Sequence, residues 1–172
     1  LVCVDTAPLL EKDYAQQSGL GWIAWNSCLI SQDHGSWLLL CEILIDVPLK
    51  PDKPLTKTDC ADCHRCQMAC PTKAILPNRT IDARRCLSYL TVEHRGPIPP
   101  AFCPLMGQRI FGCDTCQTIC PSNQKAESVP TLLDHDQLLD PHPDLIESFL
   151  LTETEFKSRY ANTPVLRAKY QG

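Results

Sequence analysis

This 172-residue chain has few aromatic side chains, no long uninterrupted apolar run and only a small excess of negative charge. Phe, Trp and Tyr make up 6% of it. The longest apolar stretch, 37–45, is interrupted by Glu42, so no membrane span is predicted. The 16 basic and 20 acidic residues leave a net charge of −4, which excludes a strong overall attraction to nucleic acid but not a local basic patch.

Cysteine, in contrast, is abundant in this chain. Its 12 cysteines are about 7% of the residues, still below the density of small disulfide-bonded scaffolds. Eight of them follow a pattern: Cys60-x-x-Cys63-x-x-Cys66-x-x-x-Cys70-Pro71, then Cys113-x-x-Cys116-x-x-x-Cys120-Pro121, with Cys86 between the two runs. The first spacing is that of bacterial ferredoxins, in which the fourth cysteine ligates the other of two 4Fe–4S clusters.

Two such runs predict two 4Fe–4S clusters that exchange their fourth ligands. Cys66 and Cys70 are four residues apart, so on a helical turn they share a face at different heights. Cys66 can then bind one cluster while Cys70 reaches the other, and Pro71 turns the chain away. The second run lacks a first cysteine, for which Cys86 substitutes. The predicted ligand sets are Cys60, Cys63, Cys66 and Cys120 for one cluster, and Cys70, Cys86, Cys113 and Cys116 for the other.

Zinc and disulfide bonds stay open as alternatives. Eight thiolates would fill two four-cysteine zinc sites, but the third cysteine and the Cys-Pro ending favour iron–sulfur clusters. Cys-x-x-Cys loops also suit metal or redox roles better than disulfide bonds. Of the other cysteines, Cys3, Cys28 and Cys41 stand in apolar stretches, where a free thiol is usually buried, and Cys103 fits no ligand pattern. So many free thiols predict a reducing cytoplasm.

Residues 1–47 show an α/β pattern, and the first domain is predicted to cover residues 1–55. We expect the end of a strand at 1–4 and then a turn that opens a helix ending near Gln17. Runs of apolar and β-branched residues predict strands at 22–30 and 37–45. Three prolines between 48 and 58 indicate a linker to the next part of the chain.

The remaining two parts differ in composition. Residues 56–125 contain the patterned cysteines and a helix predicted over 82–92, with Asp82 as its N-cap. Residues 126–172 are predicted to be helical. One helix is expected within 143–151, and a Thr-x-x-Glu capping box at 152–155 begins another.

Several strings outside the cysteine spacing point to a family. They are Val-Asp-Thr-Ala-Pro-Leu-Leu-Glu-Lys at 4–12, Asp-Ala-Arg-Arg-Cys-Leu-Ser-Tyr-Leu-Thr at 82–91 and Met-Gly-Gln-Arg-Ile-Phe-Gly-Cys-Asp-Thr-Cys-Gln at 106–117. Together with Gly-Leu-Gly-Trp at 19–22 and Gly-Ser at 35–36, they resemble the epoxyqueuosine reductase family over nearly all of residues 1–123.

The resemblance implies an α+β fold: the end of an α/β cobalamin-binding domain, a ferredoxin-like domain with two 4Fe–4S clusters, and a short helical tail. It implies a cobalamin-dependent oxidoreductase that reduces epoxyqueuosine to queuosine at the wobble position of tRNA. It also implies an electron donor such as a flavodoxin or a ferredoxin. We expect a monomer without membrane attachment, and we expect that the first part of the cobalamin domain precedes Leu1.

The same resemblance implies site residues. Asp5, in an Asp-x-x-Pro turn, matches the aspartate proposed as proton donor, whereas residue type alone favours a helix N-cap there. Gly19, Gly21 and Ser36 are candidates for contact with cobalamin, because glycine permits close approach of the backbone. Ordinary turn formation explains these three residues equally well.

The chain departs from the family pattern at three positions. Trp25 replaces a lysine, Cys41 replaces a glycine, and Cys103 replaces a basic residue. Two other classes of protein stay open. One is another cobalamin and iron–sulfur reductase, related to reductive dehalogenases, against which the string at 82–91 argues. The other is a two-cluster electron carrier, which would not need the segment 1–47.

Overall fold

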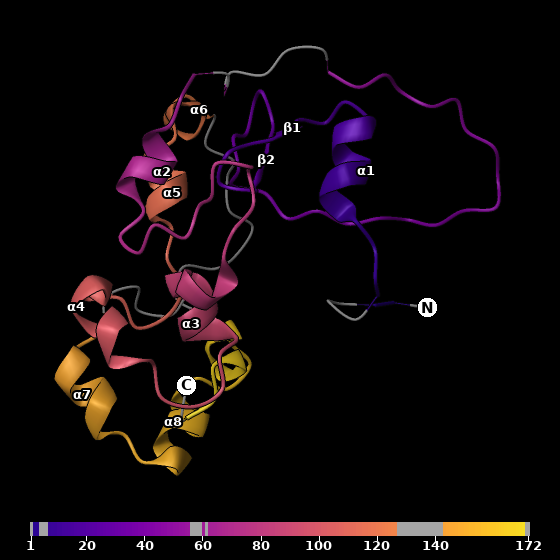
Figure 1. Ribbon diagram of the computed structural model, residues 1–172. Helices are drawn as coiled ribbons and strands as arrows, with labels where there is room; N and C mark the ends of the chain where they lie inside the picture. The colour runs from indigo at the N-terminus through magenta and orange to yellow at the C-terminus, as the bar shows by residue number, and fades with distance from the viewer. Residues whose placement is uncertain (1, 4–6, 56–59, 61, 127–142, 171–172) are drawn as a thin grey trace.

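In the computed structural model, the described part of the chain forms short helices and a small hairpin (Figure 1). The structure describes residues 2–3, 7–55, 60, 62–126 and 143–170. Among the described helices, none is long and apolar enough to cross a membrane.

The N-terminal segment consists of a helix and a hairpin. Helix α1 spans Glu11–Gln17, and strands β1 (Trp22–Ile23) and β2 (Leu29–Ile30) pair antiparallel, with Trp22 opposite Ile30. Gly21 allows this pairing, because a Cβ at its position would lie 2.2 Å from the Ile30 carbonyl oxygen.

Two predictions for this segment are wrong. The strand expected over 22–30 is a hairpin with a turn in its middle, and 37–45 forms neither strand nor helix. Figure 1 shows that stretch as part of a wide open loop, in which the Leu39 side chain is 99% exposed. A strand needs a neighbour to pair its backbone N–H and C=O groups, and no described segment pairs with 37–45.

Val2 and Cys3, the described part of the strand expected at 1–4, are exposed and lie outside any strand. Cys41 is exposed as well, so the expectation of buried thiols is wrong for Cys3 and Cys41. Cys28 is half-buried, and burial raises the pKa of its thiol.

The middle of the chain holds helices α2 (Arg65–Ala69), α3 (Leu87–Val92), α4 (Cys103–Met106), α5 (Thr115–Thr118) and α6 (Pro121–Gln124), with 3₁₀ turns η1 (Ala83–Arg85) and η2 (Pro100–Phe102). Helices α2 and α5, one from each cysteine run, pack against each other (Figure 1). Asp82 caps η1 as predicted, its carboxylate accepting from the Arg84 N–H at 3.2 Å. The helix predicted over 82–92 is divided at Cys86, whose backbone is extended.

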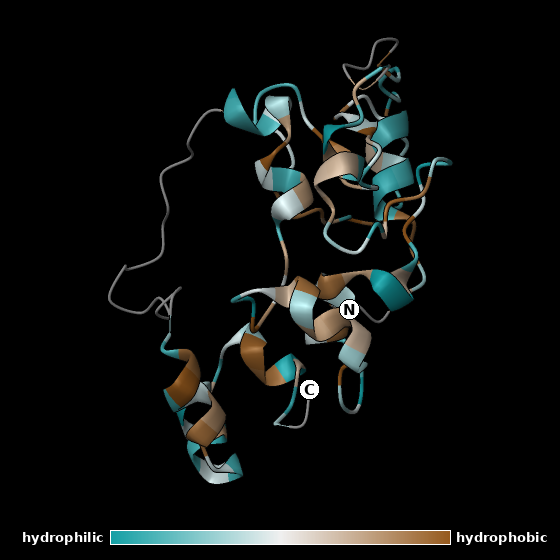
Figure 2. Cartoon of the chain, turned by 60° about the vertical axis from the view of Figure 1, so that its left-hand side comes forward, coloured by the Kyte–Doolittle hydropathy of each residue, from teal (hydrophilic) through white to brown (hydrophobic). Residues whose placement is uncertain are grey.

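The C-terminal part holds α7 (Leu145–Leu150), α8 (Glu153–Arg159) and the 3₁₀ turn η4 (Pro164–Arg167). The predicted capping box at 152–155 is confirmed, since both of its reciprocal hydrogen bonds are present. Helix α7, which follows the grey segment in Figure 2, exposes three apolar side chains: Ile146, Phe149 and Leu150.

One hydrophobic core cluster joins the hairpin to the cysteine runs. Its buried members are Trp22, Ala24, Ile30 and Cys60, and Trp25, Leu55 and Cys120 pack against them. The described fold is a helix-rich α+β arrangement, in which the N-terminal segment lies directly against the cysteine-containing part.

Candidate iron–sulfur site

The first cysteine run brings three of its thiols together. Cys60 is buried and Cys63 and Cys66 are half-buried, with Cys66 inside α2. Burial raises the pKa of the Cys66 thiol to about 11, and repulsion from the neighbouring Cys60 and Cys63 adds to the shift. Cys120, the fourth predicted ligand of this set, packs against the core that contains Cys60.

The second run shows the same arrangement around α5. Burial raises the pKa of the Cys116 thiol to about 12, and nearby thiols add to it, including its predicted cluster partners Cys113 and Cys86. Cys66 is also close enough to contribute, so the two ligand sets lie side by side. The fourth predicted member, Cys70, accepts a hydrogen bond from the Ala74 N–H at 3.3 Å.

The pKa of the Cys70 thiol shifts in the opposite direction to those of Cys66 and Cys116. Burial alone would raise its pKa, but hydrogen bonds from Ala74 and Thr72 outweigh burial and lower the pKa of this thiol. Backbone N–H groups that stabilise a thiolate also stabilise a thiolate bound to metal, because the ligand must be deprotonated.

The donor set fits iron–sulfur clusters. The patterned positions of the two cysteine runs supply only thiol donors, and the Cys66 and Cys116 thiols of the two runs lie close together. In a 4Fe–4S cluster each thiolate binds a different iron. Iron would stabilise the thiolate forms of Cys66 and Cys116 through its positive charge.

Hydrogen bonds of Ser36 connect the N-terminal segment to the second cysteine run and to α6. Its N–H donates to Asn123 Oδ1 at 2.6 Å, and its hydroxyl donates to Gln117 Oε1 at 2.8 Å. Asn123 Nδ2 donates in turn to the Ser36 hydroxyl at 2.7 Å. Ser36 is therefore buried at a contact between the N-terminal segment and α5–α6.

This contact gives a prediction for Gly35. Its φ is +60°, and a Cβ there would lie 2.1 Å from Asn123 Oδ1, so Gly35→Ala introduces backbone strain and a clash. Gly96→Ala is the matched control, because its φ is +103° but no atom lies within 4 Å of its added Cβ. We expect the free energy of unfolding in urea to fall by about 1–3 kcal/mol more for Gly35→Ala than for Gly96→Ala. Equal losses would show that the Asn123 contact contributes nothing.

Other parts of the chain lie directly against the three candidate cobalamin residues. A Cβ at Gly19 would lie 2.5 Å from the Lys53 carbonyl oxygen, Gly21 faces Ile30, and Ser36 is hydrogen-bonded as described above. These contacts give the three residues roles in turns and packing. Their contact with cobalamin stays a prediction, and Asp5 lies outside the described residues.

Trp25, one of the departures from the family pattern, lies beside the first cysteine run. Its indole N–H donates to the Cys60 carbonyl oxygen at 2.7 Å, and its ring contacts the ring of His64 with centroids 4.8 Å apart. The Arg79 guanidinium lies 4.7 Å from the centroid of the Trp25 ring. The Arg79 cation therefore lies against the aromatic ring at position 25.

Sequence reasoning missed two residues that contact the predicted ligands. The indole N–H of Trp22 donates to Cys60 Sγ at 3.4 Å, and Asn26 Nδ2 donates to the Cys116 carbonyl oxygen at 3.3 Å. Both residues belong to the hairpin, far from the cysteines in sequence. Motif spacing carries no signal for such contacts.

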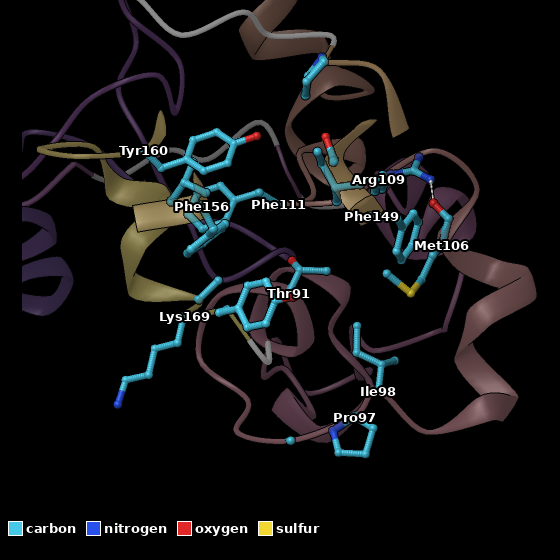
Figure 3. Close-up of a pocket in the computed structure, with 17 residues that line it drawn as sticks. Thr91, Pro97, Ile98, Met106, Arg109, Phe111, Phe149, Phe156, Tyr160 and Lys169 are labelled. Carbon is cyan, nitrogen blue, oxygen red and sulfur yellow. Dashed lines mark hydrogen bonds between the residues drawn. The ribbon is translucent and has the colours of Figure 1, made fainter. Parts of the chain in front are cut away.

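A cavity of about 880 Å³ lies between the 96–111 region and the C-terminal helices (Figure 3). Aromatic side chains such as Phe111, Phe149 and Phe156 line it. Arg109, in its wall, donates to the Met106 carbonyl oxygen and to Thr115 Oγ1, each at 2.9 Å. These hydrogen bonds assign Arg109 a role in packing the second run.

Comparison with known proteins identifies the cysteine-containing part. The family described as a 4Fe-4S double cluster binding domain matches residues 59–123. The epoxyqueuosine reductase of Aliivibrio fischeri is 44% identical over 164 residues, 95% of this chain and 44% of the relative. That of Pseudomonas aeruginosa is 43% identical over 171 residues, 98% of this chain and 46% of the relative.

Solved structures agree with the sequence comparison. The structure of epoxyqueuosine reductase from Streptococcus thermophilus is similar with a TM-score of 0.82 and 32% identity, over 97% of this chain and 44% of that one. A crystal structure of epoxyqueuosine reductase with an epoxyqueuosine-modified tRNA stem loop has a TM-score of 0.76 and 31% identity, over 96% of this chain and 46% of that one. The chain spans less than half the length of these relatives.

Proposed function

Because the chain belongs to the epoxyqueuosine reductase family, we propose that it contributes the electron-transfer part of an enzyme that reduces epoxyqueuosine to queuosine in tRNA. The observation that carries this proposal is the pairing of α2 with α5, which brings the Cys66 and Cys116 thiols of the two runs close together. Two adjacent cysteine sets suit a site that handles more than one electron.

We propose that one cluster is held by Cys60, Cys63, Cys66 and Cys120, and the other by Cys70, Cys86, Cys113 and Cys116. The neighbouring thiols around Cys66 and Cys116 support these two sets. When bound, each 4Fe–4S cluster supplies one-electron transfer. The chain would hold the two cysteine sets side by side. The hairpin packs against Cys60 and Cys120 of the first set.

The stoichiometry of the proposed reaction fixes how many electrons and protons the enzyme must deliver. Removing the epoxide oxygen and restoring the double bond takes two electrons and two protons, and the oxygen leaves as water. Two one-electron carriers supply the two electrons. A carboxylic acid can donate a proton at neutral pH when burial raises its pKa, and from the family resemblance we propose Asp5 as the donor.

The family resemblance implies cobalamin as a further cofactor, which when bound would supply electron transfer to the epoxide. The contacts of Gly19, Gly21 and Ser36 with it stay predictions. So do the boundaries 1–55, 56–125 and 126–172, a flavodoxin or ferredoxin as donor, a monomeric state and a cytoplasmic location.

The test of the proposal is turnover of the modified tRNA. The reconstituted protein is incubated without oxygen with cobalamin, a low-potential reductant and tRNA that contains epoxyqueuosine, and the digested tRNA is analysed by mass spectrometry. We expect queuosine to form, and none to form when the reductant is left out. Protein that carries both clusters and cobalamin but makes no queuosine would overturn the proposal.

A further inference from the structure

Cys60 differs from the other predicted ligands in its surroundings. It is the one buried member of the set, at 9% exposure, while the other seven predicted ligands are half-buried. Two indole N–H groups from the hairpin reach it: that of Trp25 binds its carbonyl oxygen, and that of Trp22 binds its sulfur. The hairpin thus contacts the first cluster site at the ligand atom itself.

Trp22 is held firmly in position for this contact. Its side chain is 7% exposed and packs with Ala24 and Ile30 in the core, and its backbone pairs with Ile30 in the hairpin. An indole N–H is a donor only, so it stabilises whichever state of the sulfur carries more negative charge. The distance from Nε1 to Sγ is 3.4 Å.

We propose that Trp22 is a positioning residue that raises the reduction potential of the cluster ligated by Cys60. The inference rests on the proposed two-cluster site but not on the identity of the substrate. On reduction the cluster gains one electron and passes from the 2+ to the 1+ state, with no bond broken and no proton moved. The added charge spreads over the sulfurs, and hydrogen bonds to the sulfurs are among the factors that set the potential.

Burial acts in the opposite direction. A buried Cys60 makes the added negative charge more costly, which lowers the potential, and the Trp22 N–H offsets this cost at the sulfur. The hairpin therefore has two opposite effects on the reduction potential. It buries Cys60, which lowers the potential, and it supplies the Trp22 N–H, which raises the potential. Trp25 lacks this effect, because its N–H binds the carbonyl oxygen of Cys60 and not the sulfur.

The experiment is a redox titration of the reconstituted protein, followed by electron paramagnetic resonance, on Trp22→Phe and on Trp25→Phe. Phenylalanine keeps an apolar ring at both positions but has no N–H. We expect Trp22→Phe to shift the one-electron reduction equilibrium of one cluster about tenfold toward the oxidised state, which is about 59 mV more negative. We expect Trp25→Phe to leave the potential unchanged.

A second measurement uses the unsubstituted protein and so does not depend on a variant that folds. With tryptophan labelled by ¹⁵N in the indole ring, pulsed paramagnetic resonance of the reduced protein should detect nitrogen coupling to one cluster, and Trp25→Phe should keep that coupling. Two intact clusters with no such coupling, or with equal potentials in Trp22→Phe and the unsubstituted protein, would overturn the role of Trp22. Failure to take up iron at all would instead overturn the proposed two-cluster site.

Discussion

Replacing Cys116 by alanine is expected to remove one of the two proposed clusters and with it the proposed reductase activity. Cys116 lies on α5 among the thiols of the second set, and alanine offers no ligand for iron. Iron bound per reconstituted chain should fall from about eight to about four atoms. Queuosine formation should fall by more than the roughly 10- to 100-fold loss that is typical of changes next to metal ligands.

Cys28 is the matched control for this substitution. Its thiol is half-buried and close to Cys116, yet it belongs to neither predicted set. Cys28→Ala should keep about eight iron atoms per chain and most of the activity. If Cys28→Ala loses a cluster while Cys116→Ala keeps both, the ligand assignment is wrong. If the unsubstituted protein binds zinc rather than iron, the iron–sulfur interpretation itself is wrong.

The cysteine pattern was predictable because ligand spacing is a local property. The distances along the chain within 60–70 and 113–120 decide which thiols share a turn of helix, and α2 and α5 form at those places. The caps at Asp82 and at 152–155 were predictable for the same reason, since a cap needs residues only two or three positions away.

Contacts between distant segments were not predictable. The pattern at 37–45 suits a strand, but a strand also requires a partner, and the described chain places none there. The hydrogen bond from Trp22 to Cys60 joins residues 38 positions apart, and that from Ser36 to Asn123 joins residues 87 apart. Such contacts follow from tertiary packing, which residue type and spacing do not encode locally.

The proton donor assignment at Asp5 leads to the second large expected effect. Asparagine has nearly the shape of aspartate but no acidic proton, so Asp5→Asn should slow queuosine formation by about 10²- to 10⁴-fold, the usual contribution of a general acid. Cluster content should not change, because Asp5 is not among the predicted ligands. The measurement is single-turnover formation of queuosine with reduced enzyme in excess over the tRNA.

The same substitution separates the proton donor from a helix cap. Asparagine caps helices as well as aspartate does, so a capping role predicts full activity for Asp5→Asn and a loss of about 1 kcal/mol of stability for Asp5→Ala. Helix α1 begins at Glu11, and its N-cap is Leu10, which leaves no described helix start next to residue 5. Asp13→Asn, at an exposed position in α1, is the control and should be fully active. Normal turnover by Asp5→Asn would mean that the proton comes from another group.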